Sequence, residues 1–138
     1  MRYKEGKELI KNLTKEVLEE LDESGWLCNV SIGKTLDFAE ELNYILARNV
    51  SGYELTDNKE YLNNAVKESI NAAYELKIIV KSMSEDQISS FKNCIKPVIK
   101  QGIKKVCKNM KHNYTSNAHH CNLYDYNNLA SEAEIEKE

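Results

Sequence analysis

The chain has 138 residues, of which 41% are hydrophobic and 30% charged, and its formal net charge at pH 7 is -3. This length suits one domain and is too short for two independent cores, and the composition is that of a globular rather than a disordered protein. No run of about 18 apolar residues is present and the first residues lack the apolar core of a secretion signal. We therefore expect a cytoplasmic protein that neither spans a membrane nor is exported.

Helices are favoured over strands, because one proline and five glycines supply little turn chemistry for a sheet. The first amphipathic pattern predicts a helix from about residue 7 to residue 24, and Gly25 is expected to end it. A second pattern predicts a helix over residues 30–50, with Asn29 or Ser31 as the cap.

Ser51 and Gly52 are expected to break the second helix. The third helix is predicted to start after a cap at Thr56 or Asp57 and to end near Met83. Its apolar pattern is the most regular of the four.

Ser84 and Gln87 form a capping-box pattern that opens a fourth helix, which is predicted to run to about residue 112. Pro97 lies inside its apolar stripe, where a proline removes one backbone hydrogen bond at a cost of about 3 kcal/mol. We therefore expect a kink near residues 93–97 or a split of the helix into two pieces.

Four helices joined by short links predict an all-α fold, an up-down-up-down antiparallel four-helix bundle over residues 1–112. The remaining residues, 113–138, are polar, rich in asparagine and acidic at their end, so they are predicted to form a flexible, disordered tail. The alternative for the tail is a short helix from Asn128 to Lys137.

The fourth helix concentrates lysines. Between Gln87 and Tyr124 the chain has seven lysines and no acidic residue, and five of the lysines recur every four residues. Such a basic stripe is typical of proteins that bind a phosphate backbone by releasing counterions. The alternatives are contact with an acidic protein surface and a solvated face. The predicted nucleic-acid-binding residues are Lys92, Lys96, Lys100, Lys104, Lys105, Lys108 and Lys111.

Four residues advance about 400° around an α-helix, so the lysines are expected to drift by about 40° per step and to spiral over much of one side. From Phe91 to Lys111 the chain has no aromatic residue apart from Phe91 itself, which is assigned to the core. We therefore expect contacts to phosphate with weak sequence preference, rather than stacking of bases.

Metal or cofactor chemistry is not expected. His112, His119, His120 and Cys121, with Cys107 one turn upstream, are residue types that ligate zinc, but their spacing matches no compact zinc finger. The sequence shows no phosphate-cradling glycine loop and no carboxylate pair of defined spacing, so we predict a protein that is not an enzyme. The four widely spaced cysteines are expected to be reduced thiols.

Three stretches carry a resemblance to a known family. They are VSIGKTLDFAEELNYILARN, KEYLNNAVKESINAAYELKIIVKSMSEDQISSF and VIKQGIKKV. In helix period and loop position they resemble four-helix-bundle proteins that include the accessory variability proteins (Avd) of diversity-generating retroelements and the proteins encoded in 23S rRNA intervening sequences. The resemblance implies a non-enzymatic, barrel-shaped homo-oligomer, often a pentamer, that binds a reverse transcriptase and nucleic acid.

The sequence thus predicts an accessory protein that binds RNA or DNA through its fourth helix and scaffolds a reverse transcriptase or a similar protein. The alternative is a protein-interaction module, such as a phage or mobile-element factor, that docks on an acidic protein surface. A third possibility is a metal-dependent enzyme that uses the histidine-rich tail.

Overall fold

The computed structural model describes residues 2–113, and the side chains of residues 4–110, as four helices without a strand. The all-α prediction is confirmed. The predicted tail lies outside the described residues, except Asn113, which ends the last helix. The helices are α1 (Arg2–Glu23), α2 (Ile32–Thr56), α3 (Glu60–Glu75) and α4 (Glu85–Asn113).

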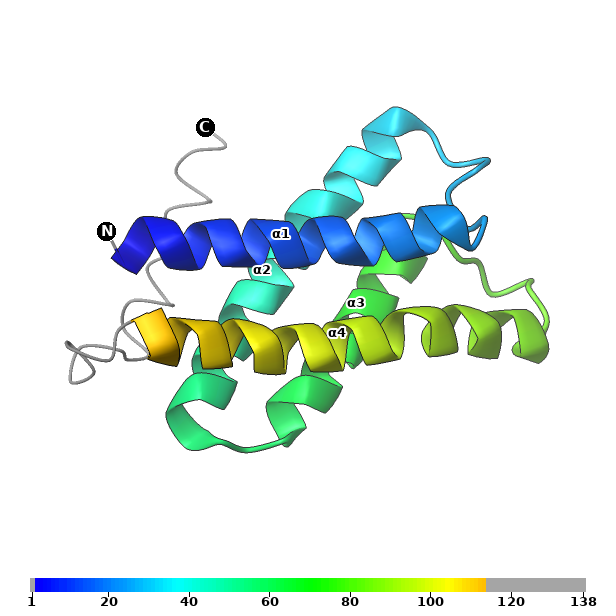
Figure 1. Ribbon diagram of the computed structural model, residues 1–138. Coiled ribbons are helices and arrows are strands. Elements are labelled where there is room, and N and C mark those ends of the chain that lie inside the picture. Colours follow the sequence, from blue (N-terminus) through cyan, green and yellow to red (C-terminus); the bar gives the residue numbers. More distant parts are fainter. Residues whose placement is uncertain (1, 114–138) are drawn as a thin grey trace.

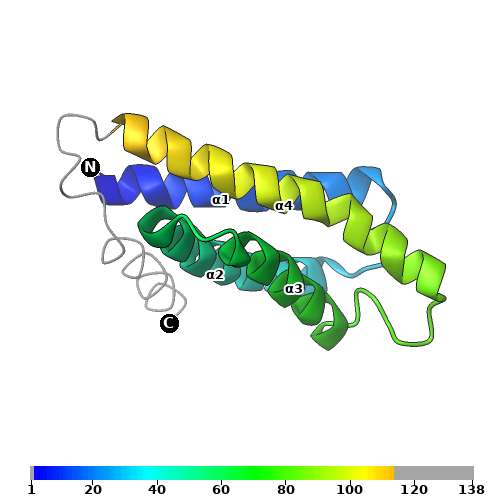
Figure 2. The ribbon, with the colours of Figure 1, turned by 90° about the horizontal axis from the view of Figure 1, so that it is seen from below.

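The helices form two layers. Helices α1 and α4 lie side by side and antiparallel, and the pair α2 and α3 crosses them at a steep angle (Figure 1). The view from below separates the two layers (Figure 2). Each helix contacts the next one along the chain and α4 also contacts α1, which is the neighbour order of the predicted up-down-up-down bundle. Of the described helices, none is long and apolar enough to cross a membrane.

The core lies between the layers, and all four helices contribute to it. Trp26, in the link after α1, packs edge-on against Phe91 of α4, with ring centroids 5.3 Å apart. The largest fully buried side chains are Ile10, Leu21, Phe38, Leu42, Leu46, Ile79, Phe91, Ile95, Ile99, Ile103 and Met110.

Three helix ends follow the local sequence patterns. Gly25 has a φ of 85° and lets the Trp26 N–H reach the Leu21 carbonyl at 2.9 Å, which closes α1. Ser31 caps α2, because its side chain accepts a hydrogen bond from the Lys34 N–H at 3.2 Å. These two predictions are confirmed, although α1 begins five residues earlier than predicted.

The capping box of α4 is also confirmed. The Ser84 N–H donates to Gln87 Oε1 at 3.1 Å, and the Gln87 N–H donates to Ser84 Oγ at 3.2 Å. Each side chain therefore satisfies a backbone donor that the first turn leaves open.

The predicted break at Ser51 and Gly52 is wrong. Helix α2 continues through both residues to Thr56, and Asp57, with a φ of 57°, ends it. Gly52 is buried, and a Cβ atom at this position would overlap the ring of Tyr61 in α3. This glycine therefore allows α2 and α3 to approach each other closely and does not form a turn.

Helix α3 ends at Glu75, eight residues before the predicted end. Lys77 takes the left-handed conformation with a φ of 59°, and the Ile78 N–H donates to the Ala73 carbonyl at 2.8 Å. Ile78 and Ile79 remain buried beyond the helix, which explains why the apolar pattern continues. No glycine or proline marks this end, because a lysine takes the place that glycine usually holds.

Replacing Lys77 by glycine should therefore stabilise the protein. A non-glycine residue in the left-handed region costs roughly 1 kcal/mol, so Lys77→Gly is expected to raise the free energy of unfolding by about 0.5–1 kcal/mol in urea titrations. Lys81, exposed in the same link, has no positive φ, and Lys81→Gly serves as the control. Equal destabilisation by both changes would contradict the prediction.

Of the two alternatives predicted for Pro97, a kink or a split of the helix, the split is wrong, because α4 runs through Pro97 without a break. Pro97 and Asn93, whose carbonyl loses its usual donor, are both exposed. Water can satisfy that carbonyl, so the proline does not have to end the helix.

Candidate nucleic-acid interface

The lysines of α4 follow a buried row. Phe91, Ile95, Ile99, Ile103 and Cys107 are at most 4% exposed, and a lysine directly follows each of them in the sequence. The two rows share the four-residue period, so about 100° separates them along the whole helix. The lysines therefore stay beside the buried row as both rows turn around the helix axis. We call this row, Lys92, Lys96, Lys100, Lys104 and Lys108, the lysine edge.

No described carboxylate neutralises these cations. Within residues 4–110, neither the lysine edge nor Lys105 forms an ion pair with another described residue. All are exposed except Lys100, which is half-buried. The positive charge of α4 therefore remains available to an external anion.

A groove of about 310 Å³ separates α3 from α4, and lysines stand on both of its sides. Helix α4 contributes Lys92, Lys96 and Lys100, whereas α3 contributes Lys67. Among the described side chains, no acidic residue lines this groove. The complete lining is Asn63, Val66, Lys67, Ile70, Lys92, Asn93, Lys96 and Lys100.

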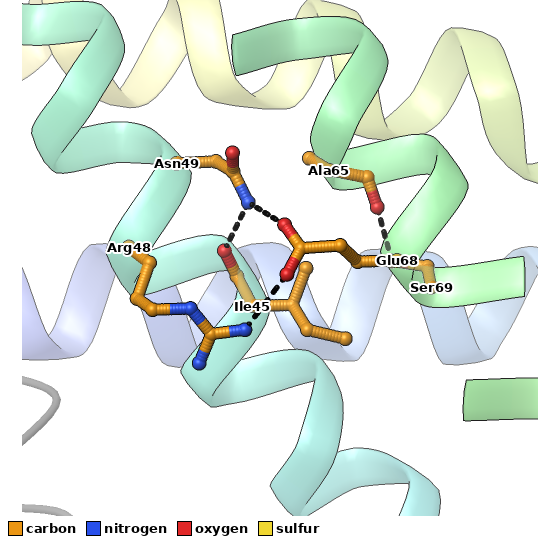
Figure 3. Close-up of polar contacts among 6 residues, drawn as sticks. All are labelled: Ile45, Arg48, Asn49, Ala65, Glu68 and Ser69. Atoms are coloured by element: carbon orange, nitrogen blue, oxygen red, sulfur yellow. Dashed lines mark hydrogen bonds and ion pairs between the residues drawn. The ribbon is translucent and has the colours of Figure 1, made fainter. Parts of the chain in front are cut away.

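The acidic residue next to Lys67 is held elsewhere. Glu68 accepts a hydrogen bond from Asn49 Nδ2 at 2.8 Å and pairs with Arg48 Nη2 at 2.9 Å, both on α2 (Figure 3). Asn49 is buried, and its Nδ2 also donates to the Ile45 carbonyl at 2.8 Å. Glu68 thus links α3 to α2 and does not line the lysine groove.

Lys67 is the residue that sequence reasoning missed. It is the only lysine between Glu60 and Glu75, in a helix whose charges are mixed, so no periodic pattern distinguishes it. Lys67 lines the groove only because α3 packs against α4, which the sequence does not show.

The predicted site residues do not all share one surface. Lys105 lines a different groove, of about 190 Å³ between α1 and α4, where Glu16 is among the lining residues. Lys104 and Lys108 are exposed beyond the α3–α4 groove. The side chain of Lys111 lies outside the described residues.

The residues of the zinc alternative also fall largely outside the described part. Only Cys107 has a described side chain, and it is buried, with its thiol 3.7 Å from the Val50 carbonyl. In residues 4–110 no group of three or more metal-ligating side chains is present. Cys28 is exposed, Cys94 is half-buried, and the described cysteines form no disulfide.

A second surface, between α1 and the start of α2, carries exposed apolar side chains. Ile32 is 81% exposed and Leu36 is 61% exposed at the start of α2. Leu36 and Leu18 together line two adjacent hollows between α1 and α2, of about 790 and 370 Å³. Exposed apolar side chains beside a groove are typical of protein-binding surfaces.

Comparison of the chain with protein-family models, with curated proteins and with solved structures finds no match.

Proposed function

We propose that the protein is a non-enzymatic, cytoplasmic accessory factor that binds RNA or DNA through α4 and scaffolds a nucleic-acid enzyme such as a reverse transcriptase. One observation supports nucleic-acid binding above all. The lysine edge runs along α4 from Lys92 to Lys108 without an ion pair to any described carboxylate.

The physical reason is that a row of like charges destabilises the helix that carries it. Like charges at i and i+4 each destabilise a helix by about 0.2–0.5 kcal/mol, and alternating signs would remove this cost. The acidic residues of the chain are numerous, but none of the described ones forms an ion pair with this edge. Binding of a polyanion would neutralise the lysines and release the counterions of the polyanion, and both effects would offset this destabilisation.

The enzyme partner and the oligomer come from the family resemblance. A reverse transcriptase would be the scaffolded protein, and a homo-oligomer, such as a pentamer, would multiply the basic surface of one chain into a positive ring. Native mass spectrometry of the purified protein measures this oligomeric state directly, and a monomer at micromolar concentration would contradict this part of the proposal.

The exposed apolar surface supports a second candidate, a module that binds a protein. Ile32 and Leu36 present apolar area that the described part of the chain leaves uncovered. In that case the lysine edge would dock on an acidic protein surface, as a phage or mobile-element factor does when it blocks or recruits a target.

Titration of the full chain with nucleic acids of unrelated sequence separates the two candidates. A nucleic-acid-binding protein should bind all of them, and the logarithm of its affinity should fall linearly with the logarithm of the salt concentration. Absence of binding at 50 mM salt, together with capture of one acidic protein in a pull-down from lysate, would favour the second candidate.

A further inference from the structure

We infer that the groove between α3 and α4 holds the backbone of a single-stranded nucleic acid, and that Lys67 of α3 contacts its phosphates together with Lys92, Lys96 and Lys100. This inference rests on the proposed function, and it names both the form of the ligand and the path that the ligand takes.

The first argument is that the cations stand on two sides of one groove. Three lysines line it from α4 and Lys67 lines it from α3, so a chain of phosphates between the helices would meet ammonium groups from both. A solvated lysine face on one helix would not require a counterpart on its neighbour. Because Arg48 and Asn49 hold Glu68 toward α2, the carboxylate next to Lys67 does not compete with a phosphate there.

The second argument is that the three α4 lysines line the same groove over a short distance. Lys92 to Lys100 spans about 12 Å along the axis of α4. A strand of duplex DNA makes a full turn in about 34 Å, so over that distance it would rotate by about a third of a turn and leave the groove. A single strand has no such constraint and can follow the groove over all three lysines.

The third argument concerns the lining between the lysines. Val66 and Ile70 are each only 8% exposed and provide an apolar floor, and Asn63 and Asn93 add amide groups. No aromatic residue is among the described side chains that line the groove, so bases have no platform on which to stack. Recognition should therefore depend on phosphates and tolerate many sequences.

Fluorescence anisotropy with labelled oligo-dT and oligo-rU, and with a DNA duplex of equal length, tests the inference. Lys67→Gln is compared with Lys34→Gln, which removes the same charge from an exposed position in the first turn of α2, outside the groove. Losing one phosphate contact to a single strand lowers the salt slope by about 0.7, which corresponds to roughly fivefold weaker binding at 0.1 M salt. Lys67→Gln should show this loss, Lys34→Gln should not, and the duplex should bind more weakly than either single strand.

The outcomes distinguish this inference from the function on which it rests. If the unmodified chain binds none of the three probes at 50 mM salt, the proposed function itself fails. If it binds them but Lys67→Gln matches Lys34→Gln, or the duplex binds as tightly as the single strands, only the groove assignment is overturned. Far-UV circular dichroism of both variants confirms that each retains its helices.

Discussion

Replacing Lys96, Lys100, Lys104 and Lys108 together by glutamine should strongly reduce the salt dependence of nucleic-acid binding and leave the helical content unchanged. Each lysine that contacts a phosphate contributes about 0.7–0.9 to the slope of log affinity against log salt, so the four changes should lower it by about 3. At 0.1 M salt this corresponds to a loss of affinity of roughly three orders of magnitude. The fold should survive, because none of the four forms an ion pair with another described residue.

A control variant must carry the same change in net charge. Lys4, Lys11, Lys15 and Lys34 are exposed on α1 and α2, and replacing them by glutamine also removes four positive charges. This control should bind almost as tightly as the unmodified chain. If both variants lose affinity equally, net charge and not the lysine edge determines binding, and if the α4 variant binds normally at every salt concentration, these lysines are not the interface.

Local patterns in the sequence predicted the helix ends that depend on local chemistry. Gly25 ends α1 through its positive φ, Ser31 caps α2, and Ser84 opens α4 with a capping box. In each case the residues that make the structure lie within a few positions of one another. The same reasoning fails at Gly52, whose role depends on the ring of Tyr61 in the next helix.

The third helix shows a different limit. Its predicted end near Met83 follows from an apolar period that continues through Ile79, yet the helix ends at Glu75. Buried side chains in a link repeat the pattern of a helix when the link packs against the core. No sequence pattern predicts the left-handed conformation of Lys77. Glycine is the usual residue at such a helix end, and a lysine adopts this conformation only at a cost in free energy.

The candidate site likewise has a part that the sequence predicts and a part that it does not. The lysine edge belongs to one helix, so its four-residue period is visible in the sequence, and its position beside the buried row follows from that period. The groove requires two helices, so Lys67 could not be found from spacing. Lys105 was grouped with its neighbours because it adjoins Lys104, but one residue turns the helix by about 100° and brings Lys105 to the groove shared with α1.

The second large effect is expected where Gly102 of α4 packs against Leu13 of α1. Gly102 of α4 is buried, and a Cβ atom there would overlap Cδ1 of Leu13 in α1, which is 2% exposed. Gly102→Ala should gain about 1 kcal/mol of helix propensity but lose about 1–3 kcal/mol to overpacking, so the protein should be destabilised. Leu13→Ala should cost about 2–5 kcal/mol, because it removes buried methyl groups and leaves a cavity.

The double variant gives the sharper prediction. Once Leu13 is alanine, the added methyl of Gly102→Ala no longer meets Cδ1 and enters the space that the leucine has left. The same substitution should then stabilise the protein by about 1 kcal/mol or more, so its sign reverses between the two backgrounds. Urea unfolding of the four proteins in the cycle measures this reversal.

Gly33→Ala is the matched control for this cycle, because a Cβ at Gly33 would meet no atom within 4 Å. It should stabilise the protein by a few tenths of a kcal/mol to about 1 kcal/mol, and by the same amount whether residue 13 is leucine or alanine. A Gly102→Ala effect that is equally independent of residue 13 would show that the two helices do not pack through these residues.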